Sequence, residues 1–425
     1  MEMQIFYDLI FFLFLWIYLP YFFIKRKYHR EFIQRMGFFP KDYFGNISHK
    51  KTIWIHAVSV GEVNAGIPLW KALREKYLAY KIVFSTVTKT GNHLAKRFAS
   101  PNETVLYFPL DLSFVVKRVL NLIKPSLLII LETELWPNFI LQCYKLKIPV
   151  ILVNARISDR AYQRYILVKF FLKPIFKRVS LVLAQSNKDR ERFINLGMEE
   201  KKVFVTGNMK FDVEYKDRGV NLDNLRGLLK EKDKLLVAGS IHRGEEKVIV
   251  FVYKELFRLF PHWKLLIAPR YLERVGEIER LIKRIGFSPV RISSLIYQLP
   301  TDYQNPIFIL DTIGQLRDFY ALADIVFVGG SLIKKGGHNI IEPALFSKPI
   351  ISGRYFFNFS DIFKKFLENN ALIICKNKEE LKRAIEKLIK NPEEREKMGM
   401  RAKEVMEREK GVVEKNLKHI ISFLN

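Results

Sequence analysis

Glutamates follow two of the apolar segments that the sequence predicts as strands. Glu62 closes the run HAVSVGE after the first segment, and Glu132 and Glu134 open the run ETELWPN after the fourth. A positioned carboxylate can act as a general base. The same residues also have structural uses, because Glu62 in a first helical turn favours the helix dipole and a buried Glu132 can pair with an arginine such as Arg156. Both interpretations stay open for both glutamates.

A glycine-rich run follows a predicted strand in the second half of the chain. Residues 329–344 read GGSLIKKGGHNIIEPA. The glycines are expected to bare backbone N–H groups for an anion, ahead of a helix that begins near His338. Glu342 would then lie one turn into this helix and face ribose or sugar hydroxyls. The run is neither a Walker P-loop nor a Gly-x-Gly-x-x-Gly dinucleotide motif. His338 and Glu342 could share a metal, but the chain contains no His-Glu-x-x-His and no Asp-x-Asp.

The elements that must position these residues alternate between apolar runs and amphipathic stretches. Unbroken apolar runs are typical of parallel strands covered on both faces. The predicted strands are 52–58, 81–87, 105–108, 126–131, 150–154, 181–184, 203–206, 235–238, 264–268, 306–310, 325–328, 349–351 and 372–375. Helices are expected at 62–77, 244–259, 271–285 and 378–389, and one or two charged helices after residue 391. This order predicts an α/β protein with two Rossmann-like, doubly wound domains that face a cleft.

Composition limits the classes of protein that remain. The 425 residues carry 71 Lys+Arg against 44 Asp+Glu, a net charge of +27, which favours anionic partners. Cys143 and Cys375 are the only cysteines, which excludes a disulfide framework, a four-cysteine zinc site and a cysteine-ligated iron–sulfur cluster. Half of the residues are hydrophobic, so disorder is excluded as the general state.

Two segments suggest contact with a membrane. Residues 9–24 are uncharged and apolar, and extension back to Ile5 gives a length that can span a bilayer. The basic block 25–30 would then stay cytoplasmic. A buried or interfacial helix and a signal peptide are the alternatives. Residues 160–178 interleave aromatic and basic side chains, which indicates either a surface for anionic lipid or a helix with a Phe-rich core face.

Taken together, these motifs resemble the Kdo transferases, which add 3-deoxy-D-manno-octulosonic acid (Kdo) to lipid A precursors. The resemblance extends over nearly the whole chain. It rests on the runs HAVSVGE (56–62), ETELWPN (132–138), NAR (154–156), GNMKFD (207–212), AGS (238–240) and APR (268–270), and on Gly-Gly-Ser/Thr-x5-Gly-x-Asn-x-Leu-Glu at 329–342. Ile341 replaces the leucine of that last pattern, and Gln315 stands where an acidic residue is expected.

The resemblance implies a metal-independent, two-domain GT-B glycosyltransferase without a cofactor. The implied donor is CMP-Kdo, the implied acceptor is lipid IVA, an anionic glycolipid precursor of lipid A, and the reaction inverts the anomeric centre. Glu62 would be the general base, with Glu31 as a weaker candidate, and Glu132 and Lys210 would be supporting catalytic residues. Ser59, Gly61 and Arg156 would face the acceptor.

The resemblance also assigns the donor site to the second half. The CMP contacts it implies are Pro269, Arg270, Ile313, Gly314, Gln315, Gly337, His338, Asn339 and Ile340. The implied Kdo contacts are Gly330, Ser331, Asn339 and Glu342. No metal ligands are implied.

The expected organisation has five parts. Residues 1–30 form a membrane anchor with a basic flank, 31–210 an acceptor domain, 211–232 a linker, 233–400 a CMP-sugar donor domain, and 401–425 a helix that returns to the first domain. The expected location is the cytoplasmic face of the bacterial inner membrane, with a single-pass N-terminal anchor.

Three rival functions remain. A GT-B transferase could use a UDP-sugar on a lipid acceptor. A basic, membrane-tethered nucleic-acid binder would need a readout element, and the sequence shows none. An inactive scaffold would not need Glu62, Arg270 and the glycine-rich run.

Overall fold

The computed structural model of the 425-residue chain describes residues 2–24, 30–41, 43–45, 50–132, 134–212, 227, 229–296 and 305–424. The chain divides into two compact units. Unit 1 comprises Met1–Val213 and Glu409–Asn425, and unit 2 comprises Glu214–Arg408. Most of the expected linker, residues 213–226 and 228, lies outside the described residues, as do residues 25–29 of the basic block.

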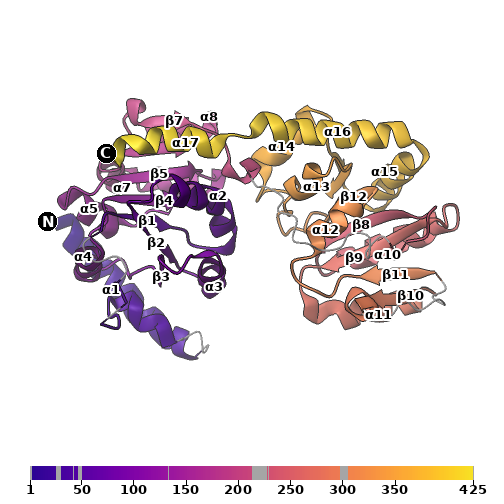
Figure 1. Cartoon of the computed structure of the whole chain (residues 1–425), viewed down its shortest axis with the longest axis horizontal. Coiled ribbons are helices and arrows are strands. Elements are labelled where there is room, and N and C mark those ends of the chain that lie inside the picture. The colour runs from indigo at the N-terminus through magenta and orange to yellow at the C-terminus, as the bar shows by residue number, and fades with distance from the viewer. Residues whose placement is uncertain are drawn as a thin grey trace. The chain divides into compact units, whose positions relative to one another are not determined.

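Unit 1 is built on a parallel sheet with the strand order β3-β2-β1-β4-β5-β6-β7 (Figure 1). Its strands are β1 Thr52–His56, β2 Lys81–Thr86, β3 Thr104–Tyr107, β4 Leu127–Leu131, β5 Val150–Ala155, β6 Leu181–Ala184 and β7 Val203–Val205. Its α-helices are α1 Glu2–Ile24, α2 Val60–Lys76, α3 Lys89–Phe98, α4 Ser113–Ile123, α5 Pro137–Lys145, α6 Asp159–Leu167, α7 Lys169–Phe176, α8 Asn187–Leu196 and α17 Val412–Ile420. Short 3-10 turns are η1 Arg30–Met36, η2 Glu200–Lys202, η3 Met209–Asp212 and η6 Ile421–Phe423.

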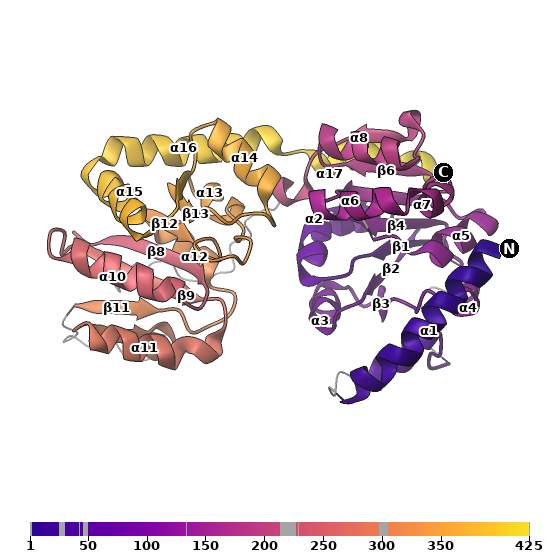
Figure 2. The same ribbon diagram turned by 180° about the vertical axis from the view of Figure 1, so that it is seen from behind.

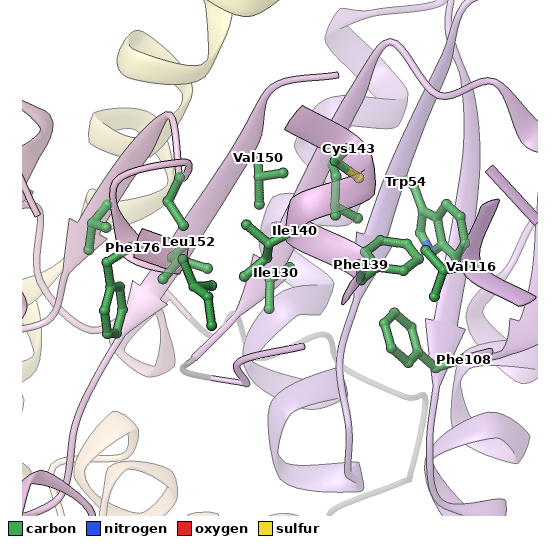
Figure 3. Close-up of a cluster of buried hydrophobic side chains, with 14 of the residues drawn as sticks. Trp54, Phe108, Val116, Ile130, Phe139, Ile140, Cys143, Val150, Leu152 and Phe176 are labelled. Carbon is green, nitrogen blue, oxygen red and sulfur yellow. The ribbon is translucent and has the colours of Figure 1, made fainter. Parts of the chain in front are cut away.

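Helices cover both faces of this sheet, as the unbroken apolar strands predict. Along β1, Trp54 belongs to the cluster under α4, α5, α7 and α8, whereas Ile53 and Ile55 belong to the cluster under α2, α3 and α17. Figures 1 and 2 show these two layers from opposite sides. In the first cluster, Trp54 packs edge-on against Phe139 with ring centroids 5.0 Å apart (Figure 3). The strands therefore lie in a double-sided core.

Unit 2 repeats this design, with the strand order β10-β11-β9-β8-β12-β13-β14. Its strands are β8 Lys234–Ile241, β9 Trp263–Pro269, β10 Ser288–Arg291, β11 Pro306–Ile309, β12 Ile325–Val328, β13 Ile350–Gly353 and β14 Ile373–Cys375. Its helices are α10 Glu245–Phe257, α11 Val275–Arg284, α12 Leu316–Leu322, α13 Ile341–Leu345, α14 Ser360–Glu368, α15 Lys378–Lys390 and α16 Pro392–Glu409, the last residue of α16 being assigned to unit 1. The 3-10 turns η4 Leu272–Arg274 and η5 Ile292–Ile296 complete it.

The prediction of two doubly wound parallel α/β domains is confirmed, because both seven-stranded sheets pair only in parallel in the described residues. In each sheet the strand order reverses beside the first strand of the unit. The reversal falls between β1 and β4 in unit 1 and between β8 and β12 in unit 2. Ligands of open α/β sheets bind beyond the carboxyl ends of the strands at such a point, so the loops there are the first places to look for a site.

The N-terminal helix α1 packs against unit 1. Phe11 and Leu15 lie on the cluster of α4 and α5, and Asp8 accepts hydrogen bonds from Ser113 N (3.0 Å) and Asn138 Nδ2 (2.6 Å). Among the described residues, no helix is long and apolar enough to cross a membrane. This finding does not support the prediction of a spanning anchor over residues 5–24.

The aromatic and basic segment 160–178 divides its side chains between core and surface. It forms α6 and α7, in which Ile175 and Phe176 are buried. Leu167 and Phe170, by contrast, are each 85% exposed. The core interpretation is therefore correct for the end of α7, and the lipid-surface interpretation stays a prediction for the exposed part.

Candidate functional site

The carboxyl ends of β1 and β4 bring Glu62 and Glu132 to the reversal point of unit 1. Ser59 is the N-cap residue of α2, and Glu62 lies in the first turn of that helix. The Glu62 carboxylate accepts hydrogen bonds from Val58 N (2.6 Å) and Ser59 Oγ (3.1 Å). The Ser59 side chain caps no backbone N–H itself, so both bonds end on the Glu62 carboxylate and fix that side chain at the end of the strand.

Glu62 is half-buried, and its pKa lies close to neutral pH. Burial and the charges of Glu132 and Glu134 together raise its pKa to about 7, against the opposing effect of the hydrogen bonds from Val58 and Ser59. Burial and Glu132 also raise the pKa of Glu134. A carboxylate with a pKa near the working pH is suited to proton abstraction.

Glu132 is paired with Lys210. The Glu132 carboxylate lies 3.6 Å from Lys210 Nζ. Glu132 has a φ of +59°, a conformation that costs free energy for a residue other than glycine. Its backbone N–H donates to Val153 O, so the left-handed turn comes directly at the sheet end. The structural interpretation of Glu132 was a pair with an arginine. It is partly correct, because Glu132 does pair with a cation, which is Lys210.

A network of side-chain amides holds the turn that carries Lys210. Asn154, also at positive φ, accepts a hydrogen bond from Met209 N (2.9 Å). Gln185 Nε2 donates to Asn154 O, and Gln185 Oε1 accepts from Asn208 Nδ2. Sequence reasoning placed Asn154 only in a motif and missed Gln185. The apolar residues before Asn154 and Gln185 indicate only that a strand ends there. They do not indicate which groups the two amides hydrogen-bond to in the fold.

The remaining acceptor candidates lie around the same strand ends. Gly61 is exposed in the first turn of α2, and a Cβ there would meet only Ser59 Oγ, at 3.8 Å. Arg156 follows β5 and is half-buried. Glu31 lies in η1, and its side chain is outside the described residues.

In unit 2 the loop after β12 is built around a buried carboxylate that the sequence did not reveal. Glu245 in α10 is fully buried and accepts backbone hydrogen bonds from His242, Gly330, Ser331 and Leu332 at 2.7–2.9 Å. The expectation that the glycines of this run bare their N–H groups for a ligand anion is therefore wrong for Gly330, and the neighbouring N–H groups of Ser331 and Leu332 are taken by the same side chain. These donors bind an internal carboxylate, which positions the loop.

The two adjacent glycines are required by this packing. A Cβ on Gly329 would lie 2.9 Å from Glu245 Oε2, and a Cβ on Gly330 would lie 2.8 Å from the His338 ring. Ser331 is buried, and its hydroxyl donates to Val328 O. The Gly-Gly-Ser run thus shapes the loop from inside.

Several donor candidates gather beyond β8, β9 and β12. Pro269 ends β9, and Arg270 N donates to Ile241 O at the end of β8. His338 Nε2 lies 2.8 Å from His242 Nε2. Asn339 donates to Glu342 through Nδ2 (3.4 Å), and Arg317 lies 3.9 Å from Glu342. These side chains form one polar group at the reversal point.

The other donor candidates differ in accessibility. Ile313 is 89% exposed, and Gly314 has a φ of +95°. Gln315 accepts a hydrogen bond from the Thr312 hydroxyl. Gly337 N donates to Gly330 O, and Ile340 is fully buried, so its side chain cannot contact a ligand. In the part of the chain that is described, no three His, Cys, Asp or Glu residues lie together as a metal site.

Two doubly wound parallel domains, each with polar groups at its reversal point, are the architecture of the GT-B type. A family profile described as "3-Deoxy-D-manno-octulosonic-acid transferase (kdotransferase)" matches residues 30–213, and one described as "Glycosyl transferases group 1" matches residues 291–405. The 3-deoxy-D-manno-octulosonic acid transferase of Haemophilus influenzae is 36% identical over 94% of this chain and 92% of its own. That of Aquifex aeolicus is 32% identical over 81% of this chain and 87% of its own.

The chain belongs to the Kdo transferase family and is a glycosyltransferase. The resemblance stated from the sequence motifs is confirmed. Among solved structures, the UDP-GlcNAc 2-epimerase of Neisseria meningitidis matches 87% of this chain and all of its own, with a TM-score of 0.61 and 15% identity. That likeness supports the fold alone.

Proposed function

We propose that this protein transfers Kdo from CMP-Kdo to lipid IVA with inversion at the anomeric carbon. The observation that carries the proposal is the Glu62 carboxylate, whose pKa is raised to about 7 at the reversal point of unit 1, in a chain of this family. Glu62 takes the proton of an acceptor hydroxyl while that oxygen attacks the anomeric carbon. The bond from this carbon to the CMP phosphate oxygen breaks, and its electron pair leaves with CMP.

Glu132 and Lys210 support this step by electrostatics. The charge of Glu132 raises the pKa of Glu62, which makes it a stronger base when ionised. Lys210 balances Glu132 at 3.6 Å and offers a positive charge to an anionic acceptor. In unit 2, Arg270 is exposed and suited to the donor phosphate. Asn339 and Glu342 offer polar atoms to the Kdo hydroxyls, with no metal required in the step.

We further propose that the protein works at the cytoplasmic face of the inner membrane without spanning it. Eight apolar side chains of α1 are exposed: Ile5, Phe6, Leu9, Ile10, Phe12, Leu13, Trp16 and Ile17. Phe6 stacks on Phe171 of α7, with ring centroids 6.4 Å apart. We call these residues, with Leu167 and Phe170, the apolar surface. Exposed cations flank it on α6 and α7, including Arg160, Arg164 and Lys173, which suits anionic lipid.

A transfer assay tests the proposed reaction. The purified chain is mixed with CMP-Kdo made in situ and a tetraacylated lipid A precursor, and the product is read by mass spectrometry. We expect a product heavier by whole Kdo units. The number of units is then counted directly. An intact protein that binds CMP but gives no product would contradict the acceptor, and one that binds UMP in place of CMP would support a UDP-sugar donor.

A further inference from the structure

Two histidines meet at the reversal point of the unit 2 sheet. His242 directly follows β8, and His338 lies in the loop after β12, the neighbouring strand. Their Nε2 atoms are 2.8 Å apart, and their rings lie 9° from parallel with centroids 5.0 Å apart. The two imidazoles hydrogen-bond directly to each other at the place where α/β sheets bind ligands, and this arrangement needs an explanation.

The surrounding structure enforces this contact. His242 is only 7% exposed, its backbone N–H is held by Glu245, and its ring meets the edge of Tyr271. His338 lies against Gly330, where any Cβ would come within 3.0 Å of its Nε2. The imidazoles are thus held together by packing on both sides.

Such a pair has a defined proton chemistry. At 2.8 Å one Nε2 must carry the hydrogen and the other must accept it. One further proton converts the pair into an imidazolium bonded to an imidazole, a charge-assisted hydrogen bond. The pair therefore stores one positive charge whenever its surroundings favour it.

Without a ligand, the surroundings oppose that charge. Burial, His242 and Arg270 lower the pKa of His338 to about 4. Burial, Arg270, Lys335 and Arg274 lower the pKa of His242, and only Glu245 acts in the opposite direction. Glu245 already accepts four backbone N–H groups. Arg274 is paired with Glu246 (2.8 Å) and Glu277 (3.0 Å). An anion bound beside Arg270 and Lys335 would raise both histidine pKa values.

We propose that the His242–His338 pair is a proton-binding part of the donor site, which takes up one proton when a nucleotide phosphate binds and releases it when the nucleotide leaves. The inference rests on the proposed CMP-sugar donor. Arg270 and Lys335 attract the phosphate, and the proton adds a third positive charge. His242 is a positioning residue, because its bond to Nε2 fixes the tautomer of His338.

The test measures protons together with affinity. Calorimetric titration of the full chain with CMP at pH 6.0, in buffers of different ionisation enthalpy and corrected for the protons that the CMP phosphate itself exchanges, gives the number of protons taken up. Because a bound anion raises a pKa by up to about three units and His338 starts at about 4, we expect wild type to take up between about half and one proton per CMP. His242→Gln keeps a donor for His338, and we expect it to abolish the uptake and weaken CMP binding about tenfold, the scale of one charge-assisted hydrogen bond. His262→Gln, at an exposed position before β9 in the same unit, is the matched control and should match wild type.

The outcomes separate the inference from the donor assignment. CMP binding to wild type without proton uptake, or unchanged uptake in His242→Gln, overturns the inference. Proton uptake by wild type tests the inference by itself, so the test stands even if the His242→Gln variant fails to fold. If CMP does not bind but UMP does, the CMP-sugar donor is wrong, and proton uptake with UMP then decides the inference. If neither nucleotide binds, both proposals are overturned.

Discussion

At the scale of single residues, Glu62 has a structural task and, as we propose, a catalytic one, which the sequence left as alternatives. It closes the first turn of α2 through Val58 and Ser59, and it is half-buried beside Glu132. The hydrogen bonds that make it structural also hold it in place as a base. The place of Glu62 in a first helical turn could be predicted from the sequence, because it directly follows an apolar strand segment and opens a predicted helix. The raised pKa could not, because Glu132 comes from a different strand.

Glu62→Gln should abolish transfer while leaving the fold and CMP binding intact. The amide keeps the size of the side chain but cannot accept the acceptor's proton, so we expect kcat to fall by ~10²–10⁴-fold. Mass-spectrometric rates and CMP titration measure the two properties. Glu75→Gln, at an exposed position of the same helix, is the control. Turnover near that of wild type would rule out Glu62 as the base.

The rate of transfer should rise with pH through about 7. Glu62, with its pKa raised to about 7, is protonated and inactive below that pH and ionised above it. Glu132→Gln removes one of the charges that raise this pKa. We therefore expect the midpoint of the kcat/KM profile to move to lower pH, alongside a lower maximum. A midpoint that stays fixed or moves upward would contradict this coupling between the two carboxylates.

At the scale of elements, the loop after β12 depends on a helix far away in the chain. Glu245 in α10 binds the N–H groups of residues 85–87 positions further on. No local pattern contains that information, so the sequence suggested an anion site where the fold has an internal carboxylate. The glycines were correctly identified as important to this loop, but Gly330 donates to a carboxylate of the protein itself.

Glu245→Gln should destabilise the protein by ~3 kcal/mol. Each carboxylate oxygen accepts two backbone N–H groups. An amide nitrogen in place of one oxygen leaves two buried donors unpaired, at ~1–3 kcal/mol each. Denaturant unfolding followed by circular dichroism measures the loss. Glu273→Gln, exposed in the same unit, should unfold like wild type. Equal stability of the two variants would show that Glu245 does not hold the loop.

The strands show the same limit of sequence reasoning. The ends of the buried central strands lie within three residues of their predicted positions. Unbroken apolar runs such as 127–131 are readily interpreted as buried strands. Strand β10 was missed. It lies at the edge of its sheet, is four residues long and contains Pro289. Proline is tolerated at an edge but argues against a strand when read from the sequence.

At the scale of the whole molecule, α1 explains why an apolar N-terminus was interpreted as a spanning helix. The helix is strongly hydrophobic, but its apolar side chains are divided between two of its faces. Phe11 and Leu15 pack on unit 1 beside the bonded Asp8, whereas Trp16 and Ile17 are 75% and 74% exposed. Composition cannot distinguish a helix that crosses a bilayer from one that lies on a domain and presents its other face.

The apolar surface yields a test of membrane binding. Trp16→Gln with Ile17→Gln removes two of its most exposed side chains, and neither packs on unit 1. Because burial of a large apolar side chain contributes ~1.5–3 kcal/mol, we expect binding to phosphatidylglycerol vesicles to weaken by at least ~10-fold. Leu167→Gln with Phe170→Gln should have a similar effect through α6 and α7. Leu78→Gln, 83% exposed elsewhere in unit 1, is the control.

The pattern of results distinguishes the two parts of the surface from each other and from charge alone. If only the α6–α7 variant loses binding, α1 does not enter the lipid, and the interleaved segment acts by itself. If neither variant differs from the control in vesicle flotation, the apolar surface is not the membrane contact. High salt should reduce binding of wild type as well, because Arg160, Arg164 and Lys173 are exposed beside the surface and their attraction to anionic lipid is screened. CMP affinity should stay constant in every variant, since the donor site that we propose lies in unit 2.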